Sequence, residues 1–135
     1  MNPIETINNF SQNTMVEHLG IIITEVSDKH ISGKMPVDHR THQPMGLLHG
    51  GASAAFAETL ASYGANMLVM PLNKTAVGQN LHINHIKSVR TGWVFGKAEL
   101  IHRGVTSQVW EIKIFNENND LVADSSLTLA IINRR

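Results

Sequence analysis

The sequence predicts an α+β fold in which one curved antiparallel sheet of six strands wraps around a long central helix, with a further helix at the N-terminus. Three observations support this prediction. Residues 52–70 are rich in Ala, Leu and Met and lack the Val, Ile and Thr density of a strand, so they indicate a helix. That helix is apolar nearly all round, so most of its sides must be buried. Four strand-like runs follow it with no intervening helix, which favours antiparallel pairing.

The first element expected along the chain is a helix that starts at Asn2-Pro3-Ile4-Glu5. This stretch offers a capping residue, a proline at the first helical position and a glutamate at the third. An apolar stripe could run from Ile4 through Ile7 and Phe10 to Met15. Gly20 suits the end of this helical region.

Two strands are expected next, "IIITEV" and "ISGKMPV". The second alternates apolar and polar residues, which places Ile31, Gly33, Met35 and Val37 on one face. After the central helix, which should end at Pro71, the remaining strands are "TAVGQNLHINHI", "WVFGKAELIH", "SQVWEIKIF" and "LVADSSLTLAII". A sheet of this kind has exposed edges, and pairing with a second copy of the chain is one way to cover them.

Length and composition restrict the class of protein. The chain has 135 residues, which suits a single domain over residues 1–135. Its 11 basic and 11 acidic residues balance, which argues against nucleic acid or an anionic membrane as the main partner. It has no cysteine, no signal-peptide pattern at the start and no apolar run long enough to span a bilayer. We therefore expect a soluble cytoplasmic protein.

Glu58 is an unusual residue in the central helix. Apart from the Tyr63 phenol, it is the only ionisable side chain between Gly50 and Met70. An isolated buried carboxylate is costly, so either the helix has one exposed edge or Glu58 serves a function. Ser62 lies one turn later on the same face, and a carboxylate beside a hydroxyl can hold a water molecule.

His49-Gly50-Gly51 stands where a loop enters this helix. Free backbone N–H groups at a helix start can stabilise an oxyanion that develops on a carbonyl, and His49 and Gln43 could add donors. The alternative is an ordinary turn before a helix. Gly50 and Glu58 are eight residues apart, which is about 12 Å along a helix. One small carbonyl cannot contact both, so joint action would require two subunits.

The segment "PVDHRTHQPMGLLHGGASAAFAETLAS", together with Asn80–His85 and "QVWEIKIF", resembles the hotdog-fold acyl-CoA thioesterases. The spacing Gln-(x)5-His-Gly-Gly-(x)6-Glu carries most of the resemblance. The chain is most similar to the Glu-type 4-hydroxybenzoyl-CoA thioesterases and 1,4-dihydroxy-2-naphthoyl-CoA hydrolases. This resemblance implies a hotdog fold, a homodimer with two sites at its interface, and usually a homotetramer.

The resemblance also assigns roles to residues. It implies that Glu58 is the general base or nucleophile and that the Gly50 N–H binds the thioester carbonyl. It implies that Gln43 and His49 orient the thioester and that Ser62 positions the attacking water. No cofactor is implied. His82 and His85 do not suggest a metal site, because residues three apart on a strand face opposite sides.

Coenzyme A carries phosphates, so the resemblance also predicts donors and cations at the mouth of the site. These candidates are His85, Lys87, Ser88, Arg90 and Arg103. The alternative is that these charges belong to solvated turns. An aromatic acyl group is favoured by the resemblance alone, with Phe56, Met67 and Leu68 as possible lining residues.

Two other functions remain open from the sequence. One is an acyl-thioester hydratase or dehydratase on the same fold, although its usual His-containing motif is absent here. The other is a non-catalytic acyl-CoA-binding protein. The sequence does not choose between a water attack and an anhydride formed by Glu58, or between coenzyme A and a carrier protein as the thiol.

Overall fold

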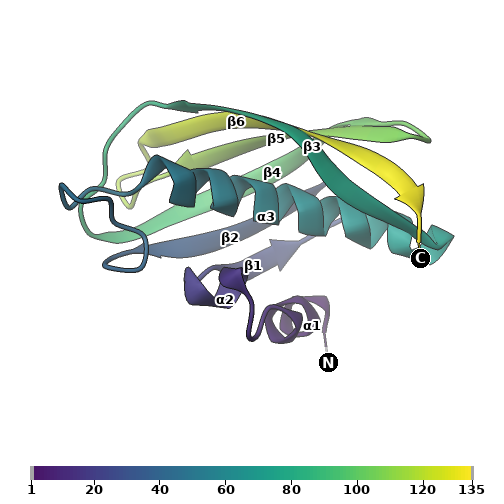
Figure 1. The fold of residues 1–135 in the computed structure, drawn as a ribbon, viewed down its shortest axis with the longest axis horizontal. Helices are drawn as coiled ribbons and strands as arrows, with labels where there is room; N and C mark the ends of the chain where they lie inside the picture. Colours follow the sequence, from purple (N-terminus) through teal and green to yellow (C-terminus); the bar gives the residue numbers. More distant parts are fainter. Residues whose placement is uncertain (1, 135) are drawn as a thin grey trace.

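The computed structural model describes residues 2–134, and the strands in this range form one antiparallel sheet in the order β1-β2-β4-β5-β6-β3. Figure 1 shows the sheet curving around the long helix α3 (Gly50–Val69), which lies across its concave face. The strands in chain order are β1 (Ile22–Val26), β2 (His30–Val37), β3 (Lys74–His85), β4 (Gly92–Arg103), β5 (Ser107–Phe115) and β6 (Leu121–Asn133). The predicted hotdog fold is confirmed.

The face of α3 that contacts the sheet is packed closely because small residues allow it to approach. A Cβ atom added to Gly64 would lie 2.6 Å from the ring of Trp110. Phe56 and Leu60 are fully buried on the same side, and burying each such side chain stabilises the fold by about 1.5–3 kcal/mol. α3 gives way to a short 3-10 turn, η1 (Met70–Leu72), which leads into β3.

The N-terminal region forms two short helices, α1 (Pro3–Phe10) and α2 (Met15–His18), where the sequence suggested one helical region ending at Gly20. The Asn2 side chain caps α1, as expected. The break occurs because Asn13 adopts a left-handed conformation with φ 62°. The expected apolar stripe is therefore interrupted, and Phe10 is 78% exposed.

Each of the two edge strands, β1 and β3, is paired at one residue with an asparagine side chain from a helix. The Asn8 side chain of α1 donates to Ile23 O and accepts from Ile23 N, at 3.0 and 2.9 Å, so it pairs with the β1 edge as a strand would. On β3 the Asn66 side chain of α3 makes the same two bonds to Ala76. Most of β3 beyond that point is exposed to solvent.

Candidate active site

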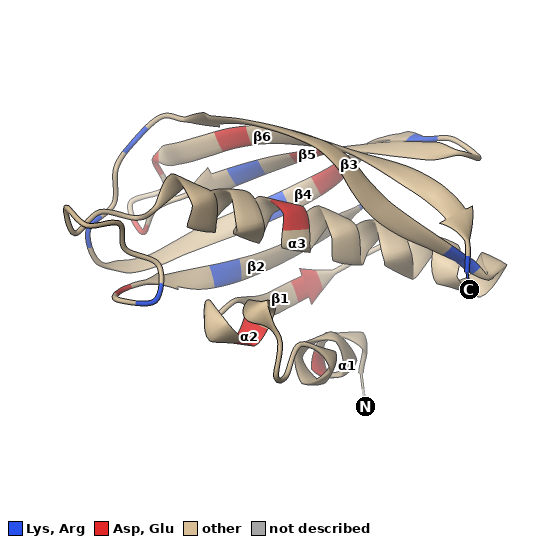
Figure 2. Cartoon of the chain, viewed as in Figure 1, with Lys and Arg blue, Asp and Glu red and all other residues tan. Residues whose placement is uncertain are grey.

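The carboxylate of Glu58 lies on the open side of α3. Glu58 is the only acidic residue of α3, which has no Lys or Arg, and it is the red position near the middle of that helix in Figure 2. The Glu58 side chain is exposed within the protomer, which corresponds to the exposed helix edge considered from the sequence. The carboxylate is directed against β3, because a Cβ atom added to Gly78 would lie 2.6 Å from Glu58 Oε2.

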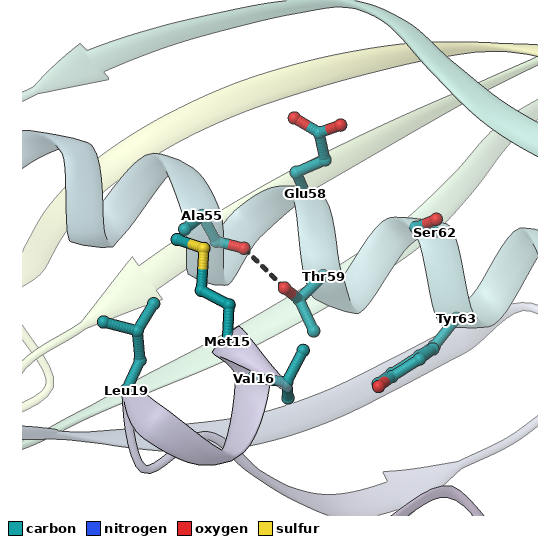
Figure 3. Close-up of a pocket in the computed structure, with 8 residues that line it drawn as sticks. All are labelled: Met15, Val16, Leu19, Ala55, Glu58, Thr59, Ser62 and Tyr63. Carbon is teal, nitrogen blue, oxygen red and sulfur yellow. Dashed lines mark hydrogen bonds between the residues drawn. The ribbon is translucent and has the colours of Figure 1, made fainter. Parts of the chain in front are cut away.

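A cavity of about 360 Å³ lies between α2 and α3 and is bordered on one side by Glu58 (Figure 3). Its lining residues are Met15, Val16, Leu19, Ala55, Glu58, Thr59, Ser62 and Tyr63. In Figure 3 the side chains of Glu58 and Ser62 point to the same side of α3, as their spacing predicts. The Thr59 hydroxyl donates to Ala55 O at 2.7 Å, so it is occupied within the helix.

The start of α3 presents one free donor. The N–H groups of Ala52 and Ser53 both donate to His49 O, and the N–H of Gly51 donates to His49 Nδ1 at 2.7 Å. Within residues 2–134 the Gly50 N–H has no acceptor. Because Nδ1 of His49 accepts a hydrogen bond, the neutral ring carries its proton on Nε2, which can donate as well.

The loop before α3 holds Gln43 in a fixed orientation. Its side-chain oxygen accepts from the N–H groups of Met45 and Leu47, which leaves the side-chain NH₂ as a donor. His42 Nε2 lies 2.7 Å from Arg90 O, and Leu48 N donates to Val89 O at 2.8 Å. The loop is therefore fastened to the segment that follows β3.

Four of the residues predicted to bind coenzyme A lie at the end of β3 and in this segment. The ring of His85 covers Gly50, because a Cβ atom there would lie 2.9 Å from His85 Nε2. Lys87 forms an ion pair with Asp120 at 3.0 Å, and this hydrogen bond lowers the pKa of the Asp120 carboxyl. Ser88 and Arg90 are exposed, and Arg90 has no ion-pair partner in the described part of the chain.

Two of the residues suggested by the sequence lie elsewhere in the protomer. Arg103 is at the far end of β4, where its guanidinium donates to Leu68 O at 3.3 Å. Leu68 is 18 residues from Gly50 along α3, or about 27 Å, so Arg103 is separated from the other predicted cations. Phe56 is wrong as a lining residue, because it is fully buried in the core.

The residue that sequence reasoning missed is Gly78. It sits in the strand-like run "TAVGQNLHINHI", and an isolated glycine in such a run is a signal of a bulge or a close approach. Both occur here: the β3–β6 register shifts between Gly78 and Asn80, and Glu58 lies against the glycine.

One protomer thus presents two groups of functional side chains that are separated along α3. Gln43, His49 and Gly50 offer hydrogen-bond donors at its N-terminus, while Glu58 and Ser62 lie near its middle. Residues 2–134 contain no cluster of three His, Asp or Glu side chains arranged as a metal site. No helix in this range is long and apolar enough to cross a membrane.

Comparison with known proteins identifies the family. A model of the thioesterase superfamily matches residues 45–123. The proofreading thioesterase EntH of Cronobacter sakazakii is 46% identical over 129 residues, covering 96% of this chain and 93% of that protein. The crystal structure of a Haemophilus influenzae thioesterase has a TM-score of 0.93 at 44% identity, covering 98% of this chain and 92% of that one.

A third relative is a thioesterase of Staphylococcus aureus, crystallised with a glutamine-to-alanine change. It has a TM-score of 0.85 at 36% identity and covers 87% of this chain and 98% of that one. The same protein has been crystallised with a glutamate-to-alanine change. These relatives confirm the expected class of enzyme, a thioester hydrolase on a hotdog fold. The chain belongs to the thioesterase superfamily.

Proposed function

We propose that this protein hydrolyses acyl-CoA thioesters in a site shared by two copies of the chain, with Glu58 as the base or nucleophile. The observation that carries the proposal is the split arrangement along α3. The free donors at Gly50, Gln43 and His49 suit a thioester carbonyl, and the Glu58 carboxylate is the group that can activate water. About 12 Å separates the two groups within one helix, so an antiparallel second α3 is needed to bring them together.

The open edge of β3 supports this assembly. The strand from Val77 to His85 is largely exposed, and both Glu58 and Gly50 lie beside it. Pairing of two β3 edges would place a second copy next to both groups. We propose that the protein forms a homodimer with two sites and that two dimers pair into a homotetramer. We also propose a cytoplasmic location.

In the proposed reaction the Gly50 N–H and the Gln43 NH₂ bind the thioester oxygen, which becomes negatively charged as the carbonyl is attacked. Glu58 takes a proton from water held beside Ser62 as the water oxygen adds to the carbonyl carbon, and the C–S bond then breaks to release coenzyme A as a thiolate, which takes up the proton. In the alternative route Glu58 attacks directly and water hydrolyses the resulting anhydride. Both routes use the same residues and release one acid and one thiol.

A glutamate in this role favours the Glu-type 4-hydroxybenzoyl-CoA and 1,4-dihydroxy-2-naphthoyl-CoA branch, so we propose an aromatic acyl group. In the Staphylococcus aureus thioesterase, the glutamine and the glutamate that were replaced are separated by the same number of residues as Gln43 and Glu58. That spacing supports the assignment of this pair. Exposed Arg90 follows Ser88 and His85 in the chain and has no ion-pair partner in the described residues, so it is the cation we assign to a phosphate of coenzyme A.

The first experiment measures thiol release from benzoyl-, hydroxybenzoyl-, naphthoyl- and hexanoyl-CoA. A thiol reagent reports cleanly because the protein has no cysteine. Glu58→Gln should lower kcat by about 100-fold or more on the aryl substrates while the fold is retained. Glu99→Gln, an exposed glutamate on β4, is the matched control and should be fully active. Full activity of Glu58→Gln would refute the proposed role.

A mixing experiment tests the shared site. Glu58→Gln and Gln43→Ala subunits are each expected to be inactive as homodimers. If the site is shared, a mixed dimer contains one intact site, so an equal mixture should recover about a quarter of wild-type activity. No recovery after subunit exchange would place both residues in one protomer's site.

Water addition to an enoyl-CoA without thiol release would instead favour a hydratase, and ligand binding without turnover would favour a binding protein.

A further inference from the structure

Gly78 lies on the side of β3 that faces α3, directly under the carboxylate of Glu58. A Cβ atom at this position would be 2.6 Å from Glu58 Oε2 and 3.3 Å from Glu58 Cδ. The next nearest atom is Leu127 Cδ1 at 3.5 Å, which is an ordinary van der Waals contact. The space that a side chain at residue 78 would fill is therefore occupied by the Glu58 carboxylate alone.

Backbone conformation does not explain the glycine. Gly78 is not among the glycines with positive φ, so its φ angle does not require glycine. Glycine in a strand is less favourable than alanine because it loses more conformational freedom on folding. Besides the bulge that follows it, the space above residue 78 supplies a physical reason for glycine at this position.

Other glycines in the fold have a different reason to be small. Added Cβ atoms at Gly64 and Gly96 would meet Trp110 at 2.6 Å and Leu60 at 2.7 Å. Those side chains are fully buried and cannot move aside. At Gly78 the overlapping atom is the free end of an exposed side chain, so a methyl group there would displace the carboxylate rather than disturb the core.

The register between α3 and β3 is fixed close to this contact. Asn66 on α3 bonds to both the N–H and the C=O of Ala76, two residues before Gly78. The helix therefore cannot slide to relieve an overlap at residue 78. The flexible part of the contact is the side chain of Glu58.

We propose that Gly78 is a positioning residue that allows the Glu58 carboxylate to lie against the edge of β3, where it can reach the substrate. This inference rests on the proposed function of Glu58. A side chain at residue 78 would keep the fold and move the carboxylate by about the radius of a methyl group. Displacements of this size at a reacting group reduce turnover strongly.

The test compares Gly78→Ala with wild type in the full-length protein, using benzoyl-CoA as substrate. We expect kcat to fall by about tenfold or more with KM changed by less than about threefold, and thermal stability to be unchanged. Gly104→Ala, in the turn between β4 and β5, is the control for glycine replacement and should retain full kcat. Gly64→Ala is the contrast for packing and should lower Tm, because the Trp110 ring cannot yield.

A double-mutant cycle separates positioning from a general disturbance of the strand. Glu58→Asp has a shorter side chain, which withdraws the carboxylate from residue 78. In that background Gly78→Ala should change kcat by less than about threefold, so the two effects should be strongly non-additive. If Gly78→Ala lowers kcat by the same factor in wild type and in the Glu58→Asp variant, the inference is overturned.

Two further outcomes would also overturn it: a Gly78→Ala protein with wild-type kcat, or one whose Tm falls as far as that of Gly64→Ala. These results are distinct from failure of the proposed function. If Glu58→Gln keeps full activity, the role of Glu58 itself is wrong and the inference falls with it. If Glu58→Gln is inactive but Gly78→Ala is fully active, the proposed function stands and only the positioning role is lost.

Discussion

The bridge from Asn66 to β3 makes a quantitative prediction about stability. Asn66 Nδ2 donates to Ala76 O at 3.0 Å and Oδ1 accepts from Ala76 N at 2.9 Å. Nδ2 also donates to Ser62 O at 2.9 Å. This pattern of two carbonyl acceptors and one N–H donor allows only one orientation of the amide. Asn66→Ala removes all three bonds and leaves both Ala76 groups without their partner.

The expected loss follows from these bonds. Each hydrogen bond to the Ala76 backbone contributes about 1 kcal/mol, and more where the group left behind is buried; Ala76 is 3% exposed. Alanine recovers about 0.5 kcal/mol in helix propensity, so the net loss should be about 2 kcal/mol. The unfolding entropy of a 135-residue chain is about 0.28 kcal/mol/K, so Tm should fall by about 7 °C.

Thermal unfolding at one fixed protein concentration measures this change, because association would also shift Tm. Amide hydrogen exchange at Ala76 should accelerate in the same variant. Asn66→Asp retains the acceptor but turns a carboxylate toward two carbonyl oxygens, so its loss should be larger at pH 8 than at pH 5. Asn118→Ala, in the exposed turn after β5, should change Tm by less than about 2 °C. A change this small for Asn66→Ala would refute the reasoning.

Two more predictions concern the approach to α3. His49→Ala removes the cap on the Gly51 N–H and should destabilise the protein by about 1 kcal/mol. His49→Asn should keep the wild-type Tm and still lower kcat. Equal Tm values for the two variants would contradict the capping role. The Arg40 side chain and N–H hold the pKa of Asp38 at about 2. The pair therefore stabilises the fold at pH values above the ordinary carboxyl pKa, and this stabilisation is lost as the pH falls through about 2. The Asp38 side chain is 37% exposed, so solvent screening limits this contribution to less than about 1 kcal/mol. Asp38→Asn should flatten acid unfolding in that window; an unchanged acid profile would show that the pair contributes nothing.

Local sequence patterns predict the regular elements well, because the spacing of apolar residues reflects which face of each strand or helix is buried. The alternation at Ile31, Gly33, Met35 and Val37 is confirmed, since all four are buried on the face of β2 toward the core. The single N-terminal helical region was not fully correct. Its break depends on the left-handed conformation of Asn13, which helix propensity does not specify.

The candidate site was predictable only where sequence neighbours are also neighbours in space. Gln43, His49 and Gly50 lie near one another because one loop carries them. The approach of His85 to Gly50 and of Gly78 to Glu58 depends on how β3 crosses α3, which no local pattern states. Charge alone predicts that Arg103 joins the other cations, but the length of β4 carries it to the opposite end of α3, where it donates to Leu68 O.

The contrast between the sequence around Glu58 and its exposure has a physical explanation in the proposed dimer. Small apolar residues such as Ala54 and Ala55 surround it, yet they are only partly buried in the protomer, as is expected of a surface that a second copy covers. Within one protomer, water reaches the carboxylate, so folding does not incur the large free energy of burying an unpaired charge. That desolvation would occur only when two copies and a substrate enclose the site. A chain can therefore carry a reactive carboxylate in a core-like segment without loss of protomer stability, provided the enclosing surface comes from another molecule.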